Sequence, residues 1–405
     1  MARRVASTGR ILAPAALFLF VAAGCARQAQ VAPATTAAGA PATGELGAVY
    51  VPPPGRWERR DPQALGVDPG RLAEAVRIAE RGEADAMPRD LEAALTARLG
   101  QDPYGEIVGP MRPRGPAAGL IVKDGYIVAE WGDARRVDMT FSVTKSYLAT
   151  LAGVALDRGL LRGLDERIGA SVVPERFASE QNSPITWRML LQQRSEWEGE
   201  LWGKPDVADR RAGRDRALRE PGSFWEYNDV RVNLAALALL HVWQRPLPEV
   251  LRERVMDPIG ASPTWQWHGY RTSWTEVAGR RVQSVSGGGH WGGGLWISAR
   301  DHARFGLLHL RRGLWGERRV LSRAWIDAAT TPTAIRPVYG MMWWLNTDRG
   351  LYPSAPESSF FALGGGDNVI WVDPDHRLVA VLRWIGRSQT DAFIERVVAA
   401  VERDS

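Results

Sequence analysis

A serine and a lysine three residues apart offer the clearest chemistry in this 405-residue sequence. They lie in Phe141-Ser142-Val143-Thr144-Lys145, at the start of a helix predicted over about 142–157. Residues three apart on a helix share a face, so the Lys145 nitrogen is expected beside the Ser142 hydroxyl. A neighbouring base makes that hydroxyl a nucleophile, and the N–H groups of a helix N-terminus suit an oxyanion. The alternative is that Ser142 only caps the helix while Lys145 is solvated.

The elements around this pair indicate a fold class. Two apolar, β-branched runs flank Asp124-Gly125 within residues 117–132, which predicts a hairpin directly before the Ser142 helix. Residues 160–285 carry mainly helical patterns and loops. The order favours an α/β fold in which both chain ends build an antiparallel sheet flanked by helices, with a mostly helical domain inserted. Helices are expected near 68–80, 88–99, 187–192, 229–243, 247–256, 298–311 and 390–402, and late strands near 360–363, 368–372 and 378–384.

Set after a hairpin, Ser142-x-x-Lys145 resembles the serine β-lactamase and penicillin-recognising superfamily. The resemblance is nearest to the class C-like branch, which includes family VIII esterases and nylon-oligomer hydrolases. Its Pro-Gly…Tyr-x-Asn pattern is matched by Pro221-Gly222 and by Tyr227-Asn228-Asp229, 85 residues after Ser142, except that Asp229 replaces the asparagine. A third element, normally Lys-Thr-Gly or His-x-Gly before a strand, corresponds to Gly364-Gly365-Gly366. The cation is missing there, which disfavours recognition of a β-lactam or peptide carboxylate.

The resemblance implies roles for these residues. Ser142 attacks the substrate, Lys145 and Tyr227 move protons, and the N–H groups of Ser142 and Gly365 hold the oxyanion. Gly364 and Gly365 let the backbone approach a substrate closely.

Asp229 is the one departure inside a catalytic pattern. If its carboxylate points inward, it favours the charged form of Lys145, which leaves Tyr227 as the base that accepts the Ser142 proton. The alternative is that Asp229 turns away and caps the helix expected over 229–243.

The function expected from these elements is hydrolysis of a small ester or amide through a Ser142 acyl-enzyme. Alternatives are a D-amino-peptide or peptidoglycan hydrolase, a β-lactamase, and a non-catalytic scaffold of the cell envelope that keeps the fold. The intact Ser142, Lys145 and Tyr227 argue against a scaffold.

A glycine-rich segment, Gly287-Gly288-Gly289-His290-Trp291-Gly292, fits Gly-x-Gly-x-x-Gly. No strand–turn–helix unit surrounds it, so a nucleotide site is not expected. His290 is expected either to edge the substrate cleft or to be a satisfied buried histidine. The six histidines show no metal-ligand spacing, so neither a metal nor another cofactor is expected.

The N-terminus is typical of an exported bacterial lipoprotein. Residues 1–24 read as a signal peptide, with Arg3 and Arg4 before an apolar run too short to span a bilayer. Val21-Ala22-Ala23-Gly24-Cys25 resembles a lipobox, and Cys25 is the only cysteine of the chain. Because this cysteine stands where a lipobox needs it, a lipid anchor on Cys25, at the periplasmic face of the outer membrane, is expected. The alternative is an ordinary signal peptide with an incidental cysteine.

The remaining chain divides by composition. Residues 25–55, rich in Ala, Pro and Thr, are expected to form a flexible tether. Residues 56–405 are expected to form the hydrolase domain, with 56–147 and 286–405 as its α/β part and 148–285 as the helical insert. A total of 45% hydrophobic and 24% charged residues is ordinary for a globular protein.

The charge of the chain is nearly balanced once the leader is set aside. Without the three leader arginines, 48 basic residues face 46 acidic ones, and no basic run stands out. Nucleic acid is therefore not an expected partner. Only three of the basic residues are lysines, which makes the position of Lys145 more telling.

Overall fold

The structure is a computed structural model that describes residues 50–84 and 87–402. These residues belong to one compact unit. The predicted signal peptide, Cys25 and most of the predicted tether lie outside the described residues. Within the described part of the chain, no helix combines the length and the apolar character needed to cross a membrane.

A six-stranded antiparallel sheet is built from both ends of the described chain, as the sequence predicts. Its order is β11-β12-β13-β14-β1-β2. The predicted early hairpin forms around Asp124-Gly125, whose φ angles of 53° and 92° suit a tight turn. The strands are β1 (Ala118–Lys123), β2 (Tyr126–Trp131), β11 (Trp344–Leu345), β12 (Phe360–Gly364), β13 (Asn368–Asp373) and β14 (Leu378–Arg383).

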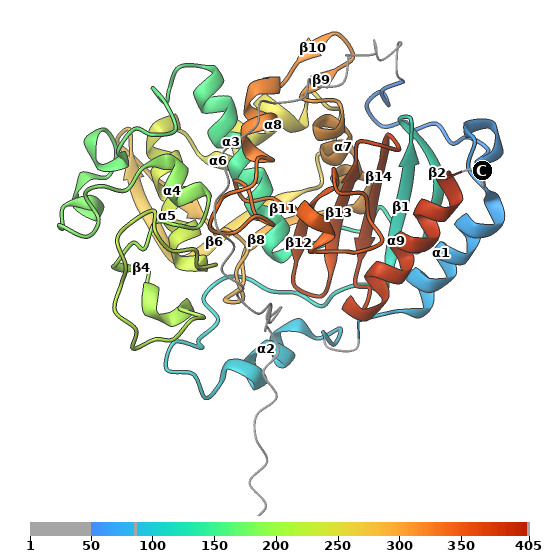
Figure 1. The fold of residues 1–405 in the computed structure, drawn as a ribbon. Coiled ribbons are helices and arrows are strands. Elements are labelled where there is room, and N and C mark those ends of the chain that lie inside the picture. The colour runs from blue at the N-terminus through green and yellow to red at the C-terminus, as the bar shows by residue number, and fades with distance from the viewer. Residues whose placement is uncertain (1–49, 85–86, 403–405) are drawn as a thin grey trace, which may run out of the picture. The chain divides into compact units, whose positions relative to one another are not determined.

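Helices cover both faces of this sheet (Figure 1). Helices α1 (Pro69–Arg81) and α9 (Arg387–Val401) pack together on one face, where Ile121 points. Helix α7 (Ala299–Leu310) packs on the other face, against Leu120 and Val122. Because side chains alternate along a strand, a strand covered on both faces is apolar at nearly every position. The burial of every residue of β1, β13 and β14 agrees with this.

Residues 148–285, the predicted insert, include the predicted helices α4 (Trp187–Leu191), α5 (Asp229–Trp243) and α6 (Leu247–Leu251), with a π-helical turn over 252–256. They also include a hairpin that the sequence pattern did not predict, β6 (Gln266–Val277) and β7 (Arg280–Val285). With β3 (Asp138–Met139) and β8 (Gly294–Ile297) it forms a four-stranded sheet of order β3-β8-β6-β7. The pairing shifts register between Gly269 and Trp274, which breaks the alternation that would have marked a strand.

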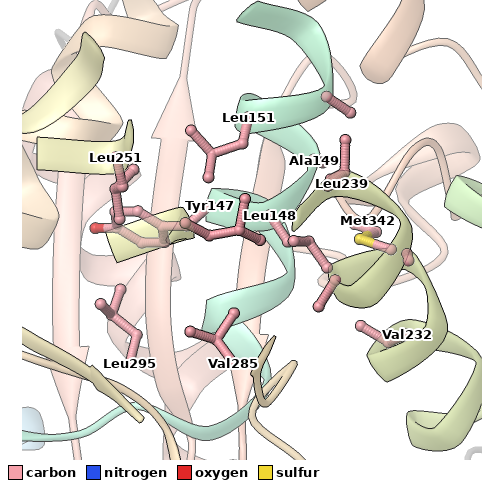
Figure 2. Packing of buried hydrophobic residues seen from close by; sticks show 14 of the residues in the cluster. Tyr147, Leu148, Ala149, Leu151, Val232, Leu239, Leu251, Val285, Leu295 and Met342 are labelled. Atoms are coloured by element: carbon pink, nitrogen blue, oxygen red, sulfur yellow. The ribbon is translucent and has the colours of Figure 1, made fainter. Parts of the chain in front are cut away.

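Helix α3 (Thr144–Asp157) is buried along nearly its whole length. Figure 2 shows its apolar side chains packed with Val232 and Leu239 of α5 and with Val285 and Leu295. This core fixes the helix that directly follows the candidate nucleophile and carries Lys145. The other elements are α2 (Leu91–Leu99), α8 (Arg323–Ala329), β4 (Glu200–Leu201), β5 (Lys204–Pro205), β9 (Leu314–Trp315) and β10 (Arg318–Arg319), and short 3₁₀ turns that include η2 (Phe141–Val143) and η5 (Asp206–Asp209).

Candidate active site

Ser142 lies in the middle of η2, two residues before α3 begins at Thr144. The residue before it, Phe141, has a φ of 47°, which is uncommon for a side chain of this size. Two contacts hold the strained residue. The Thr144 hydroxyl donates to the Phe141 carbonyl at 2.6 Å, and the buried Phe141 ring meets Trp384 edge-on with a centroid distance of 6.3 Å. The turn therefore presents Ser142 from a rigid support.

Lys145 lies beside Ser142, as the spacing predicts, and its ammonium faces three acceptors. Its Nζ donates to Ser142 Oγ at 2.9 Å and to the Gly287 carbonyl at 3.2 Å, and it lies 2.7 Å from Asp229 Oδ1. The side chain is only 2% exposed. Burial by itself would lower the pKa of Lys145, but the charges of Asp229 and Tyr227 outweigh it and raise that pKa. The alternative of a solvated lysine is wrong.

Tyr227 completes the contact with the nucleophile. Its side chain lies near enough to Ser142 for that residue to lower its pKa, and Lys145 Nζ lies 5.1 Å from its ring centroid. The ring stacks on Trp344 at 5.7 Å and meets Tyr339 edge-on at 6.1 Å. Burial raises the pKa of Tyr227, and the Asp229 carboxylate adds to this rise, while Lys145 and Ser142 oppose it.

Asp229 points into the site. It is the first residue of α5, and the cap of that helix is Asn228, whose side chain accepts from Val230 and Arg231 N–H groups at 3.0 and 3.1 Å. The alternative in which Asp229 is the cap is therefore wrong. Burial would raise the pKa of Asp229, but Lys145 and His290 hold it far below its usual range. The carboxylate is ionised and paired with Lys145.

The glycine-rich segment wraps around these groups. A Cβ on Gly289 would lie 2.6 Å from Asp229 Oδ2, so only glycine lets the backbone pass so closely. His290 follows it, one-quarter exposed, with Nδ1 3.4 Å from Asp229 Oδ2. The sequence interpretation placed His290 at the cleft edge or in the core. It did not identify the Gly287 carbonyl as a partner of Lys145, since a backbone acceptor has no residue-type signal.

The predicted third element lies at the end of β12. A Cβ on Gly364 would lie 3.2 Å from the Ser142 nitrogen and 2.2 Å from the Thr140 carbonyl, so the strand end packs directly on the nucleophile turn. A Cβ on Gly365 would lie 3.3 Å from the Phe141 ring. Gly364 also pairs with Asn368 across the β12–β13 turn. The described site thus gathers Ser142, Lys145, Tyr227, Asp229, His290 and the Gly364–Gly365 edge.

Two further charged residues, which the sequence interpretation missed, lie next to Asp229. Asp209 Oδ2 accepts from the Asp229 N–H at 2.6 Å, and the Arg211 guanidinium donates to both Asp209 oxygens at 3.3 and 3.4 Å. Arg211 Nη2 lies 3.9 Å from Asp229 Oδ2. No spacing rule links residues 209–211 to a serine near 142, because only the folded loop brings them together.

Asp209, Asp229 and His290 offer ligand-type atoms within 4.8 Å of one another. A cation held by all three would compete with Lys145 and Arg211, which already compensate both carboxylates. The site geometry therefore does not favour a metal, and no chemical step here is assigned to one.

Comparison with known proteins identifies the family. The family model described as Beta-lactamase matches residues 112–396. A penicillin-binding protein homologue from Caulobacter crescentus has a TM-score of 0.56 at 18% identity, covering 83% of this chain and 99% of its own. A family VIII carboxylesterase has a TM-score of 0.53 at 18% identity, with coverages of 83% and 99%.

An octameric penicillin-binding protein homologue from Pyrococcus abyssi has a TM-score of 0.51 at 17% identity, covering 70% of this chain and 72% of its own. At these identities the likeness concerns the fold alone. No curated protein matches the sequence. The family model spans well over half of the chain and includes Ser142, Lys145, Tyr227 and Gly365. The chain thus belongs to the Beta-lactamase family, in the superfamily of serine β-lactamase-like proteins that the Ser-x-x-Lys pattern indicated.

Proposed function

We propose that the protein is a serine hydrolase that cleaves a small ester or amide through an acyl-enzyme on Ser142. The observation that carries this proposal is the environment of Lys145 Nζ, which faces Ser142 Oγ, the Gly287 carbonyl and Asp229 Oδ1. In the charged form Lys145 donates to Ser142 Oγ and to the Gly287 carbonyl and forms an ion pair with the Asp229 carboxylate. The neighbouring carboxylate favours this charged form over the neutral amine, which alone could take the Ser142 proton.

It follows that Tyr227, not Lys145, accepts the Ser142 proton. In its phenolate form Tyr227 takes this proton while Ser142 Oγ bonds to the substrate carbonyl carbon, and the carbonyl electron pair moves onto the oxygen. The N–H groups of Ser142 and Gly365 are the proposed donors to that oxyanion. As the oxyanion collapses, the bond to the leaving group breaks, and Tyr227 returns its proton to that group. Water then repeats these steps on the acyl-enzyme and frees Ser142.

The substrate class follows from the edge of the site. Residues 363–368 read Leu-Gly-Gly-Gly-Asp-Asn, so the strand beside Ser142 offers backbone groups and no cation for a substrate carboxylate. This supports a neutral ester or amide over a β-lactam or a peptide C-terminus. The presence of a family VIII carboxylesterase among the similar structures is consistent with an ester.

A fluorophosphonate probe tests the proposal. Wild-type protein should be labelled on Ser142, and Ser142→Ala should abolish labelling and reduce turnover of p-nitrophenyl esters at least ~10³-fold. Ser146→Ala is the matched control, because this buried serine, four residues further along the chain, donates to the Met342 carbonyl at 2.8 Å instead. Its labelling should persist. Full labelling of another residue in Ser142→Ala would show that the site assignment is wrong.

Short D-amino peptides and a chromogenic cephalosporin, tested beside the esters, distinguish the alternatives. The proposal expects the ester to be turned over fastest. Faster turnover of either other substrate would favour the corresponding peptidase or β-lactamase.

A further inference from the structure

Two cations lie against the Tyr227 ring, and only one of them belongs to the Ser-x-x-Lys pair. Lys145 Nζ is 5.1 Å from the ring centroid, and Arg211 Cζ is 4.8 Å from it. Arg211 comes from the loop that joins η5 to Tyr227. Its side chain is 34% exposed, whereas those of Lys145 and Asp229 are nearly fully buried.

The charges around Tyr227 explain why a second cation matters. Asp229 pairs with Lys145 at 2.7 Å and so compensates part of the lysine charge. It also opposes the loss of the Tyr227 proton, because a carboxylate disfavours a phenolate nearby. Gly364, Gly365 and Gly366, at the strand edge of the site, contribute no charge.

The groups that face Tyr227 come from several elements. Lys145 lies on α3, Asp229 on α5, Arg211 on the preceding loop, and Tyr339 and Trp344 on the segment before β12. Asp209 and His290 contact Asp229, and Asp209 also pairs with Arg211. Among these groups, Lys145 and Arg211 are the cations that oppose Asp229 at Tyr227, and Arg211 is the one outside the Ser-x-x-Lys pair.

We propose that Arg211 is a positioning residue that offsets the Asp229 carboxylate and so keeps Tyr227 able to accept the Ser142 proton. This role rests on the proposed hydrolase function. The positive charge of Arg211 opposes the effect of the Asp229 carboxylate on Tyr227, the proposed base. Removing either one should shift the acid limb of the pH profile, and removing both should restore it.

The direction of each shift follows from the sign of the lost charge. Arg211 favours the deprotonated forms of Tyr227 and Lys145 and lowers the pKa of each. Loss of Arg211 therefore shifts the acid limb of the kcat/KM pH profile to higher pH. Asp229 raises both pKa values. Its loss moves the limb to lower pH.

The test measures kcat/KM for a p-nitrophenyl ester and the rate constant of fluorophosphonate labelling, each against pH, in the full chain. Arg211→Gln should shift the acid limb to higher pH by about one unit. At pH values on that limb, the rate should therefore fall about tenfold. Asp229→Asn should shift it down, and Asp229→Asn/Arg211→Gln should lie near wild type. Arg211→Lys, which keeps the charge, should recover most of the rate lost in Arg211→Gln.

Arg214→Gln is the matched control. Arg214 lies in the same loop and pairs with Asp102, so its loss should leave the profile unchanged. If a thermal melt shows that Arg211→Gln is not folded, the effect of Arg211 on the acid limb can be measured by comparing the double variant with Asp229→Asn.

If wild type is labelled on Ser142 and a folded Arg211→Gln keeps the acid limb of wild type, the role of Arg211 is wrong. The proposed hydrolase function is then unaffected. A wild-type protein that does not label would overturn both.

Discussion

The ammonium of Lys145 and the carboxylate of Asp229 set the chemistry open to Ser142. Both side chains are nearly fully buried, with exposed fractions of 2% and 4%. Removing one partner of such a pair leaves an uncompensated charge in the interior, which typically costs about 3–5 kcal/mol. The pair is therefore a fixed charge arrangement, and Lys145 is better suited to stabilise a neighbouring anion than to take a proton.

Substitution of Lys145 separates these two roles. Lys145→Arg keeps the cation but cannot act as a base, because arginine stays protonated. If Lys145 acts through its charge, Lys145→Arg should retain at least about tenfold more kcat/KM than Lys145→Met, in line with the usual worth of electrostatic stabilisation. Steady-state kinetics on folded variants give the comparison. Equal losses in the two variants would instead assign the base to Lys145.

At the scale of elements, the sequence predicts the helices and strands whose formation depends on neighbouring residues. The hairpin at Asp124-Gly125, the buried helix from Thr144 and the strands β12 to β14 follow from turn residues and apolar periodicity. The hairpin over 266–285 does not, since its register shift hides the alternation.

The candidate site divides in the same way. Ser142 and Lys145 are related by helix spacing alone. Their contacts with Gly287, Asp209 and Arg211 depend on loops placed by the whole fold, and no sequence pattern carries such tertiary information. The sequence allowed Asp229 either to point into the site or to cap α5. In the structure Asn228 is the N-cap of α5, and Asp229 points into the site.

The glycine-rich loop positions the site by its lack of side chains. Gly289→Ala would place a methyl group 2.6 Å from Asp229 Oδ2 and push the carboxylate away from Lys145. Misplacement of about 1 Å can cost about 10²-fold in rate, and overpacking costs about 1–3 kcal/mol of stability. We therefore expect kcat/KM to fall by about that factor and the melting temperature to drop.

The control for this loop is Gly163→Ala, where the added methyl group meets nothing within 4 Å. Its stability should stay within about 0.5 kcal/mol of wild type and its kinetics should not change. A Gly289→Ala protein with normal rates would mean that the Asp229 position does not matter to turnover.

At the scale of the whole molecule, three distant parts of the chain meet at the site. Ser142 and Lys145 come from the segment after the first hairpin, Tyr227 and Asp229 from the insert, and Gly364 from the returning strand. The six-stranded sheet joins the two chain ends, and its strand β12 packs directly against the nucleophile turn η2. The site therefore needs the complete fold, including the insert.

The location of the molecule is a separate proposal, which concerns residues outside the described part of the chain. We propose that Cys25 carries a lipid, because the only cysteine of the sequence follows Val21-Ala22-Ala23-Gly24 at the end of an apolar run. Wild-type protein should then fractionate with membranes and show an acylated Cys25 by mass spectrometry. Cys25→Ser should appear as unprocessed precursor or as soluble protein, whereas Gln30→Ala, a change a few residues further on, should fractionate like wild type. A wild-type protein that is freely soluble and carries no acyl chain would refute the anchor without touching the chemistry of Ser142, since the described residues that form the site begin far beyond the cysteine.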